Sequence, residues 1–534
     1  MTDCATRREF LGAAIAAPAI LSGCAPPDDW RTRVDGRWIG DNAALGHRVR
    51  DMAAAPPAGA RARRCDVLVV GSGIAGLSAA RALQAAGITD FAVLELEDDA
   101  GGNSRGHAMR GLPCPLGAHY LPLPGPAAPD IQAWLVEIGL ARQTAAGLKW
   151  DERHLCHSPQ ERLFFQGRWQ DGLLPDVAHT SPTQAQYQRF ARLIADTGRL
   201  GFSLPTARAP WTPAHEQLDR LTAAQWLLAN GITDPLLLAY LDYCCRDDYG
   251  AGTATVSAWA LAHYFASRHG FSAPGDDAND RDPVLTWPDG NAPLAQALRR
   301  PYADRVFTGR AAFRIDEGLH DVTAWAFAGD VVERWSAKHV VVATPLFIAA
   351  HVLRAPPPAL VAAARQQRRA PWMVANLRLD DLPLDRVGAP LSWDNVIHGS
   401  PSLGYVDAQH QSLGRVVGPR LITAYWAFPD TQRKRLLEMS WRDATQLILD
   451  DLRGVHPDLS ERLAQVDIVR HGHAMSIPTP GLRSSPALAA VAGSAARVSF
   501  AHADLSAYSV FEEAFTRGAA AGRRVARALG EGVT

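Results

Sequence analysis

Several features that would assign a function class are missing from this 534-residue chain. The formal net charge is −1, so the chain has no excess of basic residues to attract nucleic acid. No apolar run of about 18 or more residues follows residue 24, so we expect no transmembrane helix in the mature chain. With 47% hydrophobic residues, the chain can bury one large core or two.

Cysteine is also scarce. There are seven, of which Cys4 and Cys24 fall in the first 24 residues, leaving Cys65, Cys114, Cys156, Cys244 and Cys245. This odd number and the lack of a C-x-x-C pair argue against a zinc site and against a disulfide framework. We interpret the adjacent Cys244 and Cys245 as small buried residues, with a redox pair as the alternative.

The first 24 residues have the pattern of an export signal. The sequence Thr6-Arg7-Arg8-Glu9-Phe10-Leu11 matches a twin-arginine signal, and an apolar stretch to Leu21 follows it. Leu21-Ser22-Gly23-Cys24 resembles a lipoprotein cleavage box, with Cys24 as the lipidated first residue. We therefore predict twin-arginine export to the periplasm and a lipid anchor on Cys24. Residues 25 to 60, rich in Pro, Ala and Gly, are predicted to be a tether.

The clearest motif begins at residue 66. Asp66 to Val70 is a short apolar run typical of a buried parallel strand, and it leads directly into Gly71-Ser72-Gly73-Ile74-Ala75-Gly76. A helix from Leu77 to Ala86 and a second strand from Phe91 to Leu94 follow, and Glu95 ends that strand.

This order indicates a dinucleotide site rather than a glycine-rich turn without a ligand. Gly71 permits the tight turn, Gly73 lets the backbone approach a pyrophosphate, and Gly76 lets helix and strand pack closely. The pyrophosphate would lie at the helix N-terminus, and Glu95 could accept hydrogen bonds from ribose hydroxyls.

Gly101-Gly102-Asn103-Ser104 follows Glu95 closely, and this pair of motifs resembles the flavin-dependent amine oxidase superfamily. That superfamily includes monoamine and polyamine oxidases, amino-acid oxidases and phytoene-type desaturases. Its members usually have Arg just after the two glycines, where this chain has Asn103. The resemblance continues in Val284–Asn291, in the strand ending Val340-Val341-Val342-Ala343-Thr344-Pro345, and in the closing segment Arg497–Gly518. An ordinary buried strand would explain the valines of the second segment but not its Ala-Thr-Pro ending.

The resemblance implies an α/β fold. We expect an FAD-binding Rossmann-like domain of the glutathione-reductase type, interleaved with an α+β substrate domain. The FAD-binding domain would comprise residues 61–125, 284–345 and 491–530, and the substrate domain residues 126–283 and 346–490. Residues 130 to 270 are predicted to be mainly helical, in the segments Ile131–Ile138, Gln184–Thr197, Ala223–Asn230, Pro235–Cys244 and Ser257–Arg268. A strand is expected over Val306–Ile315, and the alternating runs Trp372–Leu379 and Arg420–Phe428 predict an antiparallel sheet.

The same resemblance implies the site residues. Cofactor-binding residues would be Gly71, Ser72, Gly73, Ile74, Ala75, Gly76, Glu95, Leu96, Gly101, Gly102, Asn103, Ser104, Gly117, Ala118, His119, Tyr120, Ala312, Phe313, Ala343, Thr344, Asp504 and Glu512. Candidate catalytic residues are His119, Asn376 and Tyr508. For His119, a structural role satisfied by a backbone hydrogen bond is the alternative. FAD is expected to be bound noncovalently, because no cysteine lies in the closing motif.

Two features of the sequence bear on the chemistry. Many amine oxidases carry a lysine on the substrate-domain sheet, but the only lysines here are Lys149, Lys338 and Lys434, and Asn376 is the nearest polar residue on the relevant strand. His471 and His473 would face the same side of a strand. With no carboxylate or third histidine nearby in sequence, we predict that they bind no metal.

Three hypotheses follow from the sequence. The first is an exported FAD-dependent oxidoreductase that transfers hydride from a small molecule to flavin N5, with amines as the default substrate. The second is a desaturase or isomerase of an apolar lipid, and the third is a noncatalytic flavoprotein that binds a partner. No second G-x-G-x-x-G motif is present, which argues against a separate NAD(P) site. Electrons would then leave to O2, a quinone or a redox protein.

Overall fold

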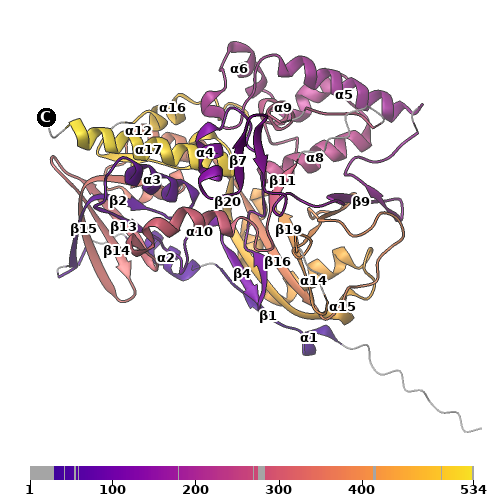
Figure 1. The fold of residues 1–534 in the computed structure, drawn as a ribbon, viewed down its shortest axis with the longest axis horizontal. Coiled ribbons are helices and arrows are strands. Elements are labelled where there is room, and N and C mark those ends of the chain that lie inside the picture. The colour runs from indigo at the N-terminus through magenta and orange to yellow at the C-terminus, as the bar shows by residue number, and fades with distance from the viewer. Residues whose placement is uncertain are drawn as a thin grey trace, which may run out of the picture.

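The structure is a computed structural model that describes residues 29–531, except 41, 53–55, 58, 179, 269, 275–282, 413–416 and 495. The predicted signal segment and Cys24 lie outside the described residues. Two sheets organise the described part of the chain, one in each lobe of the molecule (Figure 1). No helix within these ranges is long and apolar enough to cross a membrane.

The first sheet contains the predicted dinucleotide motif. Its strands, in spatial order, are β12 (Val306–Phe307), β3 (Phe91–Leu94), β2 (Arg61–Val70), β15 (Val331–Val342), β14 (Val322–Ala328) and β13 (Arg310–Glu317). Strands β12, β3, β2 and β15 are parallel, whereas β13, β14 and β15 form an antiparallel meander. The second half of β15 also pairs in parallel with β21 (Val498–Phe500), so segments from both ends of the chain meet on one strand.

Helices cover both faces of this sheet. Val67 and Val69 of β2 face one side, and Leu68 and Val70 face the other, so the strand is apolar throughout, as a doubly covered parallel strand requires. One face carries α3 (Ile74–Ala85), α4 (Pro129–Glu137), α10 (Ala292–Arg299) and α17 (Phe511–Glu531). The other carries α2 (Ala43–Asp51), α11 (Leu346–Val352), α12 (Pro358–Gln366) and α16 (Pro486–Ala492).

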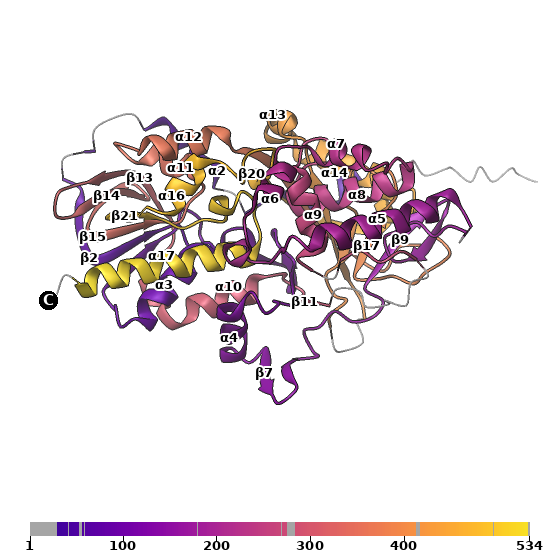
Figure 2. The ribbon, with the colours of Figure 1, turned by 90° about the horizontal axis from the view of Figure 1, so that it is seen from above.

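Helices α3 and α17 pack unusually closely. Figure 2 shows α17 running beside α3. Two glycines permit the approach, because a Cβ added at Gly518 would lie 2.0 Å from the carbonyl oxygen of Ala75, and one at Gly522 would lie 2.4 Å from that of Ala79. The sequence alone did not reveal this contact: Gly518 ends the closing segment that we identified, but nothing in that segment indicated the contact, and Gly522 lies beyond it.

The second sheet is mainly antiparallel. Its order is β1 (Asp35–Trp38), β20 (Leu463–Ile477), β16 (Arg368–Leu379), β19 (Arg420–Ala427), β18 (Tyr405–Asp407), β17 (Asp394–Ile397), β9 (Glu161–Phe165) and β10 (Arg168–Asp171). Strands β16 and β19 pair in antiparallel register, which confirms the sheet predicted from the two alternating runs. One face packs against α1 (Trp30–Arg33), α13 (Arg433–Glu438), α14 (Trp441–Leu452) and α15 (Leu459–Arg462).

A helical layer covers the other face of the second sheet. It comprises α5 (Pro182–Gly198), α6 (Pro213–Asp219), α7 (Ala223–Ala229), α8 (Pro235–Tyr249) and α9 (Ala258–Ala266). Each of the five helices predicted between residues 130 and 270 is present within a few residues of its expected bounds. The same stretch also contains strands that the helical prediction missed, because short strands with mixed polarity carry little periodic signal: β7 (Ala141–Thr144), β8 (Gly147–Trp150), β9 and β10.

Short strands and 3-10 turns complete the fold. The remaining strands are β4 (Gly106–Met109), β5 (Leu112–Pro115), β6 (Tyr120–Pro122) and β11 (Val284–Thr286). The 3-10 turns are η1 (Gly102–Ser104), η2 (Thr206–Arg208), η3 (Arg300–Arg305), η4 (Asp430–Gln432) and η5 (Ala503–Ser506).

Two sequence-based predictions differ from the structure. The strand expected over Val306–Ile315 is two strands, because Gly309 adopts a left-handed φ of 61° and turns the chain between β12 and β13. The tether expected over residues 25 to 60 is wrong for much of its length, since β1 pairs with β20 and Trp30 is buried against Trp441. Composition indicated flexibility, but single aromatic residues supply enough apolar contact to fold the segment.

Candidate active site

The glycine motif shapes one end of a cavity. Strand β2 ends at Val70, and Gly71 turns the chain with a φ of 99°. A Cβ added at Gly76 would lie 1.9 Å from the carbonyl oxygen of Gly71, so only glycine allows this turn to close. Helix α3 then begins at Ile74, and its cap residue Gly73 offers no side chain to the first N–H groups. Those groups remain available to an anion at the cavity wall.

Glu95 lies beside this turn, at the end of β3. One carboxylate oxygen accepts hydrogen bonds from the backbone N–H of Ser72 at 2.8 Å and from its hydroxyl at 2.6 Å. The other accepts from the N–H of Glu97 at 3.0 Å. These bonds fix the carboxylate at the cavity wall, where Oε1 keeps a further lone pair for a ribose hydroxyl.

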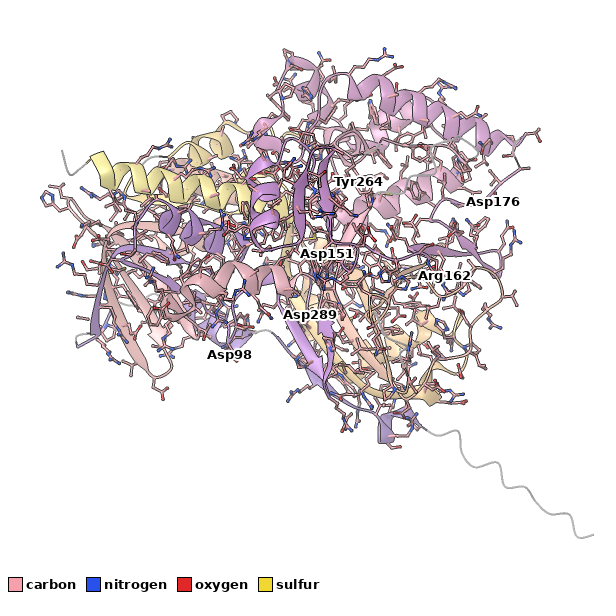
Figure 3. The ribbon with its side chains drawn as sticks, in the orientation of Figure 1. Asp98, Asp151, Arg162, Asp176, Tyr264 and Asp289 are labelled. Carbon is pink, nitrogen blue, oxygen red and sulfur yellow. The ribbon has the colours of Figure 1, made fainter. Side chains whose placement is uncertain are left out.

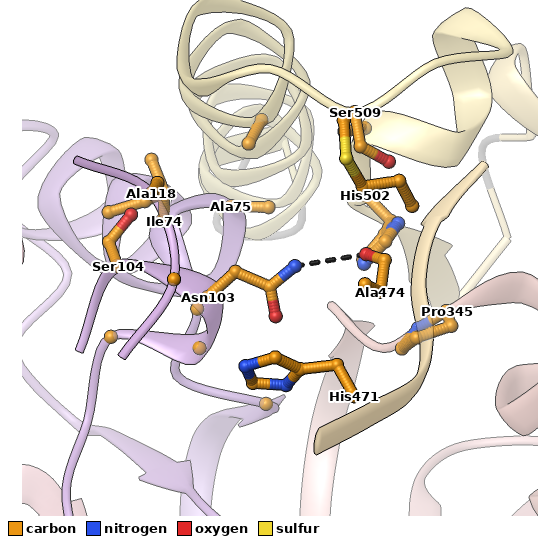
Figure 4. A pocket seen from close by; sticks show the side chains of 18 of the residues that line it. Ile74, Ala75, Asn103, Ser104, Ala118, Pro345, His471, Ala474, His502 and Ser509 are labelled. Atoms are coloured by element: carbon orange, nitrogen blue, oxygen red, sulfur yellow. Dashed lines mark hydrogen bonds between the residues drawn. The ribbon is translucent and has the colours of Figure 1, made fainter. Parts of the chain in front are cut away.

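The Gly-Gly pair packs directly on the first glycine turn. The N–H of Gly101 donates to the carbonyl of Ser72 at 2.9 Å, and a Cβ added at Gly102 would lie 3.1 Å from the Cα of Gly73. Asn103, which replaces the arginine usual in the family, donates from its side chain to the carbonyl of Ala474 at 2.9 Å (Figure 4). The nearby Arg105 instead pairs with Glu97 at 3.4 Å, so it braces the loop from outside the cavity.

A single cavity of ≈ 490 Å³ connects these elements. Most of the predicted cofactor-binding residues line it: Gly71, Gly73, Ile74, Ala75, Glu95, Leu96, Gly101, Gly102, Asn103, Ser104, Gly117, Ala118, His119, Tyr120, Ala312, Ala343, Thr344 and Glu512. Ser72, Gly76, Phe313 and Asp504 do not. Ser72 and Gly76 support the turn from behind, and Phe313 stacks on Phe327 with ring centroids 4.4 Å apart.

Asp504 has a supporting position instead of a place on the cavity wall. It is fully buried, accepts from the backbone N–H of Leu346 at 2.9 Å, and pairs with the guanidinium of Arg369. Arg369 and His502 do line the cavity, and burial followed by the charge of Arg369 lowers the pKa of His502 to about 3. His502, which stands where the family commonly has glycine, is therefore neutral.

Of the three candidate catalytic residues, only His119 lies at the cavity. Its ring stacks on Tyr425 at 4.4 Å and lies near Tyr120 and Trp393, at centroid distances of 5.1 and 5.5 Å. Burial lowers the pKa of His119 to about 3, so the imidazole is neutral and weakly basic. This residue contributes an aromatic wall more readily than a proton acceptor.

The structure places Asn376 and Tyr508 away from the cavity. Asn376 is fully buried, donates to the carbonyl of Pro115 at 2.9 Å, and accepts from the hydroxyl of Thr423 at 2.7 Å. The buried Tyr508 donates to Glu513 at 3.0 Å. On the strand where many relatives have lysine, Trp372 and Val374 line the cavity. The part of this strand that lines the cavity is therefore aromatic and aliphatic and carries no ammonium group.

The sequence-based interpretation missed charged residues that the helical layer contributes to the cavity. Asp247 and Asp248 come from α8, and Arg268 follows α9. Arg268 pairs with Asp248 at 3.0 Å. Burial, followed by the charge of Asp248, raises the pKa of Asp247 to about 7. The two adjacent aspartates were the available signal, but the helix predicted from the sequence ended at Cys244, before them, and was interpreted as packing.

Asp394, one residue beyond Trp393, adds to this acidic region. Burial and then the charge of Asp247 raise its pKa well above the usual value. Glu512, at the N-terminus of α17, also lines the cavity, and burial raises its pKa to about 7. His471 and His473 both line the cavity, as expected for residues on one side of β20. Within the described ranges, no three His, Cys, Asp or Glu side chains gather as a metal site would require.

These features fit a flavin dinucleotide. The glycine turns leave room for backbone to contact a pyrophosphate, the end of α3 favours its charge, and Glu95 is held where a ribose would lie. The cavity then continues toward the second sheet and the helical layer, which gives space for a ring system and a substrate. No cysteine of the described chain lines it, in keeping with the noncovalent binding typical of the family.

Comparison with known proteins gives the same assignment. The family model described as flavin containing amine oxidoreductase matches residues 74–528. The L-amino acid dehydrogenase of Synechocystis is 26% identical over 301 residues, 55% of this chain and 58% of that protein. Human amine oxidase [flavin-containing] B is 27% identical over 290 residues, 53% of this chain and 50% of that protein. The chain thus spans about half the length of these curated relatives.

Solved structures share the fold over most of the chain. Putrescine oxidase bound to putrescine superposes with a TM-score of 0.64 at 17% identity, covering 88% of this chain and 100% of that one. Cyclohexylamine oxidase from Brevibacterium oxydans gives 0.64 at 17% identity, with 87% and 99% covered. A fatty acid isomerase from P. acnes gives 0.59 at 16% identity, with 87% and 98% covered. With its glycine turns, its cavity and a family match over most of its length, the chain belongs to the flavin-containing amine oxidoreductases, and its cofactor is FAD.

Proposed function

We propose that the protein is an exported, FAD-dependent amine oxidase or dehydrogenase. The observation that carries this proposal is the presence of carboxylates in the same cavity as the dinucleotide cradle. Asp247 and Asp248 line it at the substrate-domain end, and Arg268 neutralises only Asp248 directly. Asp247 is half-buried, and a carboxylate in this setting without a direct cationic partner favours a positively charged ligand, since amines are protonated near neutral pH.

The residues around the acids suit a cationic substrate in a second way. Tyr120, Trp393, Tyr425 and His119 form a cluster of rings with centroids 4.4 to 5.8 Å apart, and three of them line the cavity. The faces of aromatic rings attract ammonium groups. We infer that these rings orient the carbon chain of the amine and exclude water, while Asp247 holds its charge. Bound FAD supplies the acceptor for the hydride that leaves the substrate.

We also propose that the protein acts in the periplasm, anchored to a membrane through Cys24. The motifs at residues 6–11 and 21–24 support this localisation. A twin-arginine route carries folded proteins, which suits a chain that must enclose a dinucleotide. O2, a quinone or a redox protein would then take the electrons, since a single dinucleotide motif is present.

An anaerobic titration tests the proposed reaction. Purified holoprotein is mixed with a panel of monoamines, diamines, polyamines and amino acids while the visible absorbance of oxidised flavin is followed. We expect loss of that band with at least one cationic amine. If dithionite bleaches the flavin but no amine does, the proposal fails. Fatty acids and other apolar lipids are then the next panel, and a flavin that no compound reduces would indicate a noncatalytic binding protein.

The proposed role of Asp247 predicts a pH dependence. Its pKa is raised from 3.8 to about 7, so the side chain is neutral below this pH and charged above it. The affinity for an amine that stays protonated should therefore rise with pH, with the dissociation constant falling by up to about tenfold per unit below pH 7. The measurement is the concentration dependence of anaerobic flavin reduction between about pH 5.5 and 8.5, a range in which we expect the protein to stay folded.

Two variants make this pH test specific. Asp247→Asn should remove the slope and leave affinity low at every pH. Glu512→Gln is the matched control, since the pKa of Glu512 is also about 7 and its side chain lines the same cavity from α17. Glu512→Gln should keep the slope. If the slope survives in Asp247→Asn and disappears in Glu512→Gln, the cation is held at the other end of the cavity.

A further inference from the structure

We propose that one end of the second lobe rests on a phospholipid bilayer through the apolar side chains of the loop 380–388, called here the bilayer loop. This inference rests on the anchoring at Cys24 proposed above, and adds to it the face by which the protein meets the membrane. The surface comprises the bilayer loop and the adjoining outer end of α1.

The bilayer loop exposes large apolar side chains in a short stretch. Leu382, Leu384 and Val387 are 46%, 60% and 77% exposed. They are three of the ten large hydrophobic residues that are exposed in the described part of the chain, and they lie within six residues of one another. Single exposed apolar residues are ordinary on a protein surface, but a group of this kind indicates contact with a partner or a membrane.

The rest of the protein holds the bilayer loop in place. The backbone N–H of Leu384 donates to Asp458 at 2.7 Å, and the N–H of Asp380 donates to the carbonyl of Arg462 at 2.9 Å. Within the loop, Asp385 binds Arg162 at 2.7 Å and the indole N–H of Trp169 at 2.6 Å. Figure 3 shows Arg162 inside the second lobe. The loop therefore presents its leucines outward on a fixed support and cannot fold them back onto the protein.

The chain reaches this same surface from the anchor. Arg33 of α1 donates to the carbonyls of Ser460 and Leu463, in the segment that also binds the bilayer loop. Figure 1 shows α1 at this edge of the molecule, beside α15 and β1. Asp29 caps α1 by accepting from the N–H of Arg31 at 3.1 Å. Cys24 precedes Asp29 by five residues, which span at most about 18 Å when fully extended.

That short connection sets the orientation. An acyl group on Cys24 would keep α1 within about 18 Å of the bilayer surface, which is less than the width of the lobe it belongs to. Three arginines at this end pair with neighbouring carboxylates: Arg31 with Asp29, Arg453 with Asp450, and Arg462 with Asp458. Arg33 and Arg386 donate to backbone carbonyls, and the aspartates of the bilayer loop outnumber its one arginine, so charge adds little attraction. Apolar contact by the bilayer loop is therefore the feature that recognises the membrane.

A fluorescence experiment on the full, FAD-loaded chain tests this surface. Leu384→Cys is labelled with an environment-sensitive dye, and the protein is reconstituted on vesicles of phosphatidylethanolamine and phosphatidylglycerol with brominated acyl chains. We expect on the order of a twofold loss of emission relative to unbrominated vesicles, because the side chain enters the acyl boundary. Leu319→Cys, in the turn between β13 and β14 where Leu319 is 85% exposed, is the matched control and should not be quenched.

Two further measurements separate the possible failures. Mass spectrometry of the purified chain reports whether Cys24 carries acyl groups, and bleaching by the substrate amine reports that the labelled protein remains a folded holoenzyme. An acylated, active protein with no quenching at position 384 would contradict membrane contact by the bilayer loop, while the proposed lipid anchor on Cys24 would still hold. A chain without acyl groups would contradict both the lipid anchor on Cys24 and the membrane contact of the bilayer loop that depends on it. Equal quenching at positions 384 and 319 would also contradict a defined face.

Discussion

Replacing Gly73 by valine is expected to give a folded protein that contains no flavin. A Cβ added at Gly73 meets no neighbouring protein atom closer than 3.9 Å, so the protein itself has room for the side chain. The new methyl groups would instead occupy the space where a pyrophosphate approaches the end of α3. We expect at least about a hundredfold loss of FAD affinity, because the phosphate-binding backbone is covered. The measurement is flavin content per folded chain, with circular dichroism reporting the fold.

The neighbouring Gly76 provides the contrast. A Cβ there would lie 1.9 Å from a backbone oxygen of the turn, so even alanine must push the strand and helix apart. Gly76→Ala should therefore lower the amount of soluble protein as well as the flavin content. If Gly73→Val retained FAD while folding normally, the assignment of this turn to the pyrophosphate would be wrong.

The second large effect is expected at the buried pair of Asp504 and Arg369. Asp504→Ala would remove the acceptor for both Arg369 and the N–H of Leu346, leaving a guanidinium that is 4% exposed without its counterion. Breaking a buried ion pair on one side costs about 3–5 kcal/mol. We expect a loss of this size in the free energy of unfolding, measured by urea denaturation of the flavin-loaded protein.

A double variant tests the physical cause of that loss. Asp504→Leu combined with Arg369→Met removes both charges and keeps apolar volume, so it should recover a large part of the stability. Recovery would show that the uncompensated charge is what destabilises Asp504→Ala. A double variant as unstable as the single one would show instead that the hydrogen bond to the start of α11 is the larger contribution.

The sequence predicted the dinucleotide half of the site far better than the substrate half. Gly71 to Gly76 and Glu95 obey local rules, because a turn, a helix N-terminus and a strand end are each set by neighbouring residues. Asp504 shows the limit of that reasoning, since its partners Arg369 and Leu346 are more than a hundred residues away in sequence. The closing motif placed Asp504 near the cofactor. It could not show that Asp504 binds residues behind the cavity wall and does not line the cavity itself.

The substrate end was beyond prediction for a related reason. Asp247 and Tyr425 come from a helix and a sheet that meet only in the folded chain, and of the residues around them the sequence indicated His119 and Tyr120 alone. Helical periodicity identified α8 but could not tell which of its polar residues face a cavity. Asn376 illustrates the converse. It was the nearest polar residue on the expected strand, yet its amide is used entirely by Pro115 and Thr423.

The close contact of α17 with α3 has a consequence for how the protein is made. The glycine turn near the beginning of the chain is backed by a helix at its end, through Gly518 and Gly522, and β21 joins the same sheet just before that helix. Translation proceeds from the N-terminus at about 5–20 residues per second, so the cradle emerges long before the elements that complete it. We therefore expect stable flavin binding only after β21 and α17 have left the ribosome and packed beside the glycine turn.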